Sequence, residues 1–341
     1  MARAYSGREW SVIVGIADND AGSSVGAVGA ATQDANAVSG SKFLMRPDTL
    51  NMFDYSAGYN RAEVARAGSR TLRAEDIINH YGSGIFTWDF DWLVDNEKGI
   101  QNLVELMYPS HGGTITTSIT YPATPTVNDM SHGETAETVS KLAFILLQNP
   151  LTSRDHYMHS AVLQELTLSM SATADGGLLR ASGQFMSGYK PIIEANTVGA
   201  DSSASDYAKG LFDCTTSTFG GDAAIVRDFS ITISNPASRV GWQGTGGETD
   251  GYSRGANFSI TGSITMKADS LQQINEDTFW KANTTAALVL GQGTNLDFNL
   301  PAVNVSNISY DMADEGIFQT VDFTATSGAD AGGNLAVLKF T

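Results

Sequence analysis

The sequence predicts a mainly β protein built from two tandem β-sandwich or barrel domains, each flanked by one short α-helix. Three observations support this class. The 341 residues include 35 glycines and a charged fraction of 17%, which is typical of turn-rich β proteins. Many segments alternate apolar and polar residues with a period of two, as half-buried strands do. The same order of strands and a helix then occurs twice along the chain.

The organisation along the chain is predicted from changes in pattern. Residues 1–41 are small and polar over most of their length, and we expect a flexible N-terminal arm. A first β domain is expected over 42–188, with a long loop over 55–75. Residues 189–221 break the pattern and are interpreted as a linker. A second β domain is expected over 222–341.

The strands are placed by their alternation. In the first domain they are predicted at about 43–54, 60–68, 84–93, 113–121, 137–148, 160–171 and 177–187. In the second they are predicted at about 223–235, 254–266, 285–291, 302–312, 317–326 and 334–340. Residues 161–188 align with 302–328, since both begin with Ala-Val, turn at an acidic-Gly pair and end with Ser-Gly. This similarity predicts an internal duplication.

One helix is expected in each half. In the first, Asp95 is the predicted N-cap, and apolar residues recur at i, i+3, i+4 and i+7 over about three turns at Ile100, Leu103, Val104 and Met107. In the second, Asp269 or Ser270 is the predicted cap of a helix whose apolar stripe is Leu271, Ile274 and Thr278/Phe279. Each helix would cover one sheet.

The stretch FTWDFDWL, 86–93, alternates aromatic and acidic residues. Its aromatic side chains share one face of a strand, and Asp89 and Asp91 share the other. Two carboxylates at this spacing can hold a divalent metal or perform acid–base chemistry. A metal needs further ligands, however, and an acid–base pair needs two different environments. Burial of the aromatic face explains the alternation by itself, and we favour that interpretation.

Other candidate sites are weak. His156 and His159 form a His-x-x-His pair, but the segment is interpreted as a loop that enters a strand, with no third ligand nearby. Cys214 is interpreted as a packing residue. The glycine-rich loop 244–251 has no phosphate-binding lysine. We therefore expect no enzymatic activity, no metal and no cofactor.

The charge balance restricts the partners. The net charge of −17 argues against nucleic-acid recognition through phosphate contacts, which need clustered Lys and Arg. A negative surface still suits a nucleic acid that passes by without binding. Neither a signal peptide nor a membrane-spanning stretch is recognised, so we expect synthesis in the cytoplasm and no membrane partner.

Three strands have a face of hydroxyl and carboxylate side chains opposite an apolar face. Such a face is smooth and weakly negative, and we favour a lining function for it. The candidates are Glu165, Thr167, Ser169, Asp228, Ser230, Thr232, Ser259, Thr261, Ser263 and Thr265.

The order of elements between Asp222 and Thr341 resembles that of the tail tube (major tail) proteins of long, non-contractile-tailed bacteriophages. The resemblance depends on "AIVRDFSITISNP", a glycine-rich excursion, "NFSITGSITM", the helix "DSLQQINEDTFWKA", "LPAVNVSNISYD" and "GIFQTVDFTATSG". The block from "RPDTLNMFDYSAGYNR" to "NLVELM" fits the family's N-terminal half less specifically. These are patterns of fold and not catalytic signatures.

The resemblance implies a tail-tube-like fold and a structural virion protein. Its subunits would form rings that stack into a tube around a tape-measure protein, with terminator and distal tail proteins at the ends, after assembly in the host cytoplasm. Hairpin strands of neighbouring subunits would join into one lumen barrel, through which the genomic DNA later passes as non-specific cargo. Because this chain holds two copies of the pattern, we favour homotrimeric, pseudo-hexameric rings, with hexameric rings as the alternative.

Two other functions remain as alternatives. One is a carbohydrate-binding β-sandwich, which exposed loop aromatics would favour. The other is a metal-dependent hydrolase that uses Asp89 and Asp91. An arginine-rich segment provides a further candidate surface, because it could meet the acidic body of another subunit or ring. Its residues are Arg61, Arg66, Arg70 and Arg73.

Overall fold

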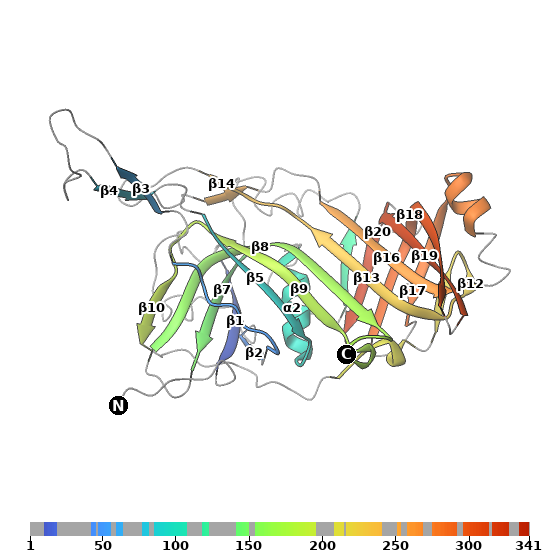
Figure 1. Cartoon of the computed structure of the whole chain (residues 1–341), viewed down its shortest axis with the longest axis horizontal. Coiled ribbons are helices and arrows are strands. Elements are labelled where there is room, and N and C mark those ends of the chain that lie inside the picture. Colours follow the sequence, from blue (N-terminus) through green and yellow to red (C-terminus); the bar gives the residue numbers. More distant parts are fainter. Residues whose placement is uncertain are drawn as a thin grey trace.

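The structure is a computed structural model (Figure 1). It describes residues 10–18, 42–45, 47–55, 59–63, 77–81, 85–107, 118–122, 141–149, 154–195, 208–214, 216–240, 251–253, 258–268, 275–291, 296–313, 316–326 and 334–340.

The protein is mainly β, as predicted. In the first half the elements are β1 (Ser11–Asp18), β2 (Phe43–Met45), β3 (Tyr59–Glu63), β4 (Ile77–Tyr81), β5 (Phe86–Leu93), α2 (Glu97–Met107), β6 (Ser118–Pro122), β7 (Lys141–Gln148), β8 (Arg154–Ser171), η4 (Asp175–Gly177), β9 (Arg180–Ser187) and β10 (Ile192–Ala195). The second half contains η5 (Leu211–Asp213), β11 (Ser217–Phe219), β12 (Asp222–Ala223), β13 (Val226–Ser234), β14 (Ser238–Val240), β15 (Gly251–Ser253), β16 (Ser259–Lys267), η6 (Glu276–Lys281), β17 (Thr285–Leu290), β18 (Leu296–Ala313), β19 (Gly316–Ala325) and β20 (Asn334–Phe340).

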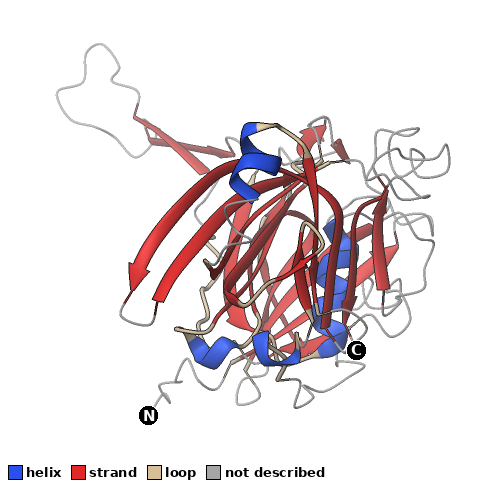
Figure 2. Cartoon of the chain, turned by 90° about the vertical axis from the view of Figure 1, so that its right-hand side faces the viewer, coloured by secondary structure: helices blue, strands red, loops and turns tan. Residues whose placement is uncertain are grey.

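Most of the described strands belong to one antiparallel 16-stranded sheet that includes both halves of the chain. The halves join at two places, where β13 pairs with β8 and where β20 pairs with β6. Two hairpins, β3–β4 and β14–β15, lie outside this sheet. The β3–β4 hairpin projects from the body in both views (Figures 1 and 2).

Several predicted boundaries are corrected. Residues 11–18 form β1, which pairs with β7 and β2, so this part of the expected flexible arm belongs to the sheet. The strand expected over 43–54 ends at Met45, and 47–55 has no regular strand. The loop expected over 55–75 contains β3, which forms a hairpin with β4. The expected linker 189–221 contains β10, which pairs with β8.

Helix α2 forms as predicted but begins one residue later than expected. The Asn96 side chain caps it by accepting a hydrogen bond from the Gly99 amide at 3.2 Å, so the predicted cap Asp95 is wrong by one residue. The stripe from Ile100 to Met107 is buried, and the helix packs against β8. In the second half the described helix is η6; the predicted caps Asp269 and Ser270 and the apolar Leu271 and Ile274 lie outside the described residues.

Strand pairing is the same in the two halves. In the first, β9 lies between β5 and the long β8; in the second, β19 lies between β16 and the long β18. Both long strands have 18 residues. Each has one register shift against its hairpin partner, at Gln164 in β8 and at Ser306 in β18. Aligning the two shifts makes Glu165 equivalent to Asn307 and Met170 equivalent to Met312.

The two halves share one hydrophobic core. A single buried cluster runs from the β5 aromatics to Phe340, and it includes alternate residues of β8, β13, β16 and β19. Phe229 of β13 and Phe298 of β18 meet within it, with ring centroids 5.1 Å apart. The domain boundaries at 42–188 and 222–341 therefore stay a prediction, since sheet and core both continue across them.

Candidate functional surface

The face of the sheet opposite the core carries rows of small polar side chains. Seven neighbouring strands contribute to it, in the order β5, β9, β8, β13, β16, β19 and β18. The register aligns their polar residues into rows perpendicular to the strands. One row is Asp91, Ser182, Thr167, Thr232, Thr261, Thr324 and Asn304. The next is Arg180, Ser169, Ser230, Ser263, Asp322 and Asn307. We call this surface the polar face.

All ten residues predicted to line a lumen lie on the polar face. The register places Asp228 opposite Thr265, Ser230 opposite Ser263, and Thr232 opposite Thr261, with the β8 candidates on the other side of β13. Their common face follows from antiparallel pairing, in which directly opposed residues point the same way. Thr265 is 6% exposed, so it contributes less surface than the others.

Hydroxyl groups on the polar face bond laterally to one another. Thr167 Oγ1 lies 2.8 Å from Thr232 Oγ1 across the junction of the two halves, and Thr265 Oγ1 lies 2.9 Å from Thr320 Oγ1. Ser171 donates to the Asp228 carboxylate at 2.5 Å. In each threonine pair one hydroxyl donates to the other, which leaves fewer donors for a phosphate group, and carboxylates repel it. The chemistry of this face therefore disfavours binding of a polyanion.

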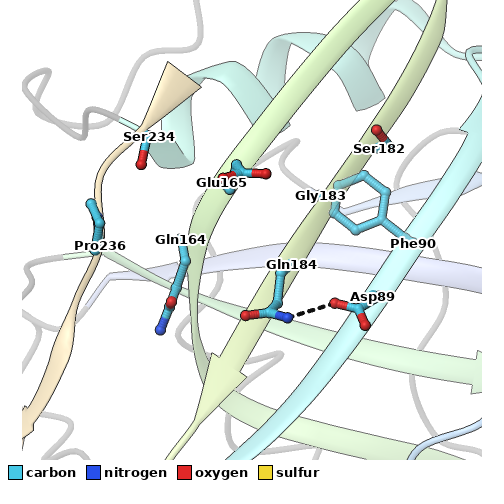
Figure 3. Close-up of a pocket in the computed structure, with 9 residues that line it drawn as sticks. All are labelled: Asp89, Phe90, Gln164, Glu165, Ser182, Gly183, Gln184, Ser234 and Pro236. Carbon is cyan, nitrogen blue, oxygen red and sulfur yellow. Dashed lines mark hydrogen bonds between the residues drawn. The ribbon is translucent and has the colours of Figure 1, made fainter. Parts of the chain in front are cut away.

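A pocket of about 400 Å³ opens on this face between β5, β9, β8 and β13 (Figure 3). Asp89 and Glu165 line it, and the Gln184 amide donates to Asp89 Oδ1 at 2.7 Å. The described residues contain no group of three or more His, Cys, Asp and Glu side chains able to hold a metal. The pocket is a depression in the sheet surface lined by both polar and apolar residues.

Asp89 and Asp91 have different partners. Asp91 accepts a hydrogen bond from Arg180 Nε at 2.5 Å, and the same guanidinium binds Asp48 at 3.0 Å and Asp175 at 3.3 Å. Burial raises the pKa of Asp48, but the hydrogen bonds from Arg180 and from the Leu93 amide together lower it by more. The pKa of Asp48 is therefore below its ordinary value. The two carboxylates of FTWDFDWL are therefore held apart on the polar face. Its aromatic residues are buried, as predicted.

The two histidines lie in β8, which corrects the expected loop at this position. His156 contacts the Tyr55 hydroxyl at 2.5 Å and the Trp10 ring. His159 packs between the rings of Tyr157 and Tyr189. Residues three apart on a strand face opposite ways, so the pair does not converge on one ligand.

The remaining candidates are only partly placed. Burial raises the pKa of the Cys214 thiol to about 12, with Asp213 and Asp297 adding to the effect, which agrees with a packing role. Arg61 lies in β3, opposite Asn79 of β4. Arg66, Arg70 and Arg73 lie outside the described residues. Arg180 is a site residue that the sequence did not predict. Its partners at 48, 91 and 175 have no regular spacing that could indicate the ion-pair cluster.

The protein has a large sheet with a hydrophobic core on one side and a continuous polar face on the other. These features are typical of a structural β protein that acts through an extended surface. The family model described as phage tail tube protein matches residues 17–325, and the chain belongs to this family. The protein is thus a structural component of a phage tail. None of the curated proteins compared with the chain matches it. No helix in the described part of the chain is long and apolar enough to span a membrane.

Proposed function

We propose that the chain assembles into stacked rings that form the tail tube of a long, non-contractile-tailed phage, with the polar face lining the lumen. The observation that carries this proposal is the continuity of the polar face across β8 and β13, because it extends one lining over both halves of the chain. DNA would pass over bonded hydroxyls and carboxylates on its way to the host. No enzymatic step is part of this function.

We favour three chains per ring over six, because the repeated strand pairing supports two equivalent units in each chain. Each chain would contribute two equivalent units, so a trimer would have pseudo-sixfold symmetry. Further partners would be a tape-measure protein within the tube and terminator and distal tail proteins at its ends. The arginine-rich segment, with Arg61 on the projecting hairpin, would contact a neighbouring subunit or ring. Assembly would occur in the host cytoplasm.

Electron microscopy and mass measurement of the purified chain test the assembly. We expect rings or tubes, with a ring mass three times the 36.1 kDa of the chain. A ring of six chains would contradict the trimer, and a dispersed monomer under all conditions would contradict the tube itself.

The lining role has its own test. Ser230 and Ser263 are directly opposed on the polar face. We expect the double variant Ser230→Lys, Ser263→Lys to form tubes that retain double-stranded DNA fragments in a salt-sensitive way, whereas the native tube retains none. The matched Ser→Asp double variant should behave like the native tube. Equal DNA retention by the lysine and aspartate variants would place the polar face away from the lumen.

A further inference from the structure

The two long hairpin strands are equivalent in sequence position but differ in burial. Leu168 and Met170 of β8 are 0% and 1% exposed, whereas their equivalents in β18, Tyr310 and Met312, are 50% and 82% exposed. Exposed apolar side chains of this size within a strand are typical of a surface that another chain covers.

The first half has a strand on each side of this stretch. Residues 165–169 of β8 pair with β9 on one side, and residues 165–171 pair with β13 on the other. Helix α2 also packs against β8. The equivalent stretch of β18, 307–313, pairs with β19 on one side, and the described residues place no strand ladder along its other side. Within the described residues, the second half thus has no paired strand at the position where the first half holds β13. We call this side of 307–313 the open edge of β18. The short helix η6 contacts β18, and the Tyr310 hydroxyl donates to Glu276 of η6 at 3.2 Å.

A complementary position exists at β5. Its equivalent, β16, lies between β19 and β13. Beside β5, in the place of β13, lies the segment 47–55, which is attached by side chains instead of a strand ladder. Thr49 donates to the Asp91 carbonyl at 2.7 Å, the Leu93 amide donates to Asp48 at 3.1 Å, and the Trp88 indole donates to the Asn51 carbonyl at 2.8 Å.

The hairpins that follow these segments extend the equivalence. β14–β15 follows β13, and its Tyr252 docks on the first half by donating to the Ser160 carbonyl at 2.6 Å and accepting from the Gly188 amide at 2.7 Å. β3–β4 follows 47–55 and instead projects from the body (Figure 1). This is the arrangement expected when the docking surface of β3–β4 belongs to a neighbouring copy.

We propose that 47–55 is the seam strand between copies: it pairs with β5 of its own chain and with the open edge of β18 in a second copy, in the register that β13 has on β8. This inference depends on the proposed ring assembly and specifies its interface. The intramolecular junction supplies the register. Ser230 lies between Ser263 and Ser169, which are equivalent to Asp89 and Asp311. Asn51 donates to the Asp89 carbonyl at 3.5 Å, so Asn51 is expected opposite Asp311 of the neighbour.

Cysteine cross-linking tests the register. In a Cys214→Ser background, the pair Asn51→Cys and Asp311→Cys would be oxidised in assembled rings and in dispersed chains. We expect covalent multimers in the rings and at least tenfold fewer in dispersed chains. The matched pair Asn51→Cys and Asn307→Cys lies four residues out of register, about 13 Å along the strand, and should not cross-link.

The outcomes separate the two proposals. Rings that cross-link equally at Asn307, or at neither position, would overturn the seam while the tube proposal stands. Failure of the native chain to form rings would overturn both. If the double variant does not fold, the two single variants can be mixed before assembly. An interface between an Asn51→Cys copy and an Asp311→Cys copy then contains both cysteines of the cross-link. A Met312→Lys variant is expected to fold as the native chain does and to lose ring formation; undiminished rings would count against the seam.

Discussion

Met170 and Met312 occupy equivalent positions in the two long strands, yet Met170 is buried in the core and Met312 is exposed. The surroundings of the two residues differ: β8 pairs with β13 and packs against α2, whereas the described residues place no strand on the corresponding side of β18. Met170 therefore reports on packing within the chain, and Met312 reports on the packing that we propose between chains.

We expect the two methionines to respond oppositely to truncation. Met170→Ala removes buried methylene and thioether groups and should lower the free energy of unfolding of dispersed protein by about 2–4 kcal/mol. Met312→Ala should change it by less than about 0.5 kcal/mol, because the side chain is already in water. Denaturant titration of both variants measures this. Equal losses would show that Met312 is buried in the dispersed chain.

The second prediction concerns stability against pH. Burial lowers the pKa of His159 from its ordinary 6.5 to about 4. Between pH 6.5 and 4, His159 is protonated in the unfolded chain but neutral in the folded one. The free energy of unfolding is therefore at its full value above pH 6.5 and decreases as the pH drops towards 4. The loss should reach about 3 kcal/mol. We expect His159→Phe to remove this contribution to the slope of unfolding free energy against pH, and an unchanged slope would argue against a buried neutral imidazole.

A third prediction concerns Arg180, which joins three carboxylates from separate segments. Arg180→Met should lower stability by about 1 kcal/mol and loosen 47–55, because the Asp48 that accepts from the Leu93 amide loses its own partner. Hydrogen exchange at Leu93 should become faster. Arg227→Met is the matched control, since Arg227 pairs with Asp228 and Asp311 and does not contact Asp48. Faster exchange at Leu93 in both variants would point to a general loss of stability.

The fourth prediction concerns Gly262 in β16. A Cβ there would lie 2.3 Å from the Ser230 carbonyl oxygen and 2.7 Å from the Phe323 ring. Gly262→Ala should therefore lower the free energy of unfolding by about 1–3 kcal/mol, because the backbone of β13 must move. Thr261→Ala, at the adjacent exposed position, is the control. A Gly262→Ala variant as stable as this control would contradict the close packing of Phe323 over the glycine.

Features of the fold could be predicted from the sequence where they depend on residues close together in the chain. Alternation from Phe86 to Trp92 and from Phe229 to Ile233 identified strands and their buried faces, because the period of two is a local property of the backbone. The ten lining candidates share one face for the same reason. Positions 154–159 were misassigned, since Tyr157, Met158 and His159 are consecutive buried residues on both faces of β8 and therefore do not alternate.

The sequence by itself determined the β class, the α2 stripe, the repeated order of elements and the polarity of each strand face, all of which follow from residue type and spacing within a few positions. Only the tertiary structure decided that β13 pairs with β8 and that Arg180 binds Asp48, Asp91 and Asp175. It also decided that residues 307–313 of β18 pair on one side only among the described strands. The reason is physical: pairing between strands far apart in the chain depends on shape and register in three dimensions, and no local period encodes it. The stretch FTWDFDW illustrates this difference. Its alternation predicted which residues are buried, whereas the partners of Asp89 and Asp91 come from other parts of the chain and could not be predicted.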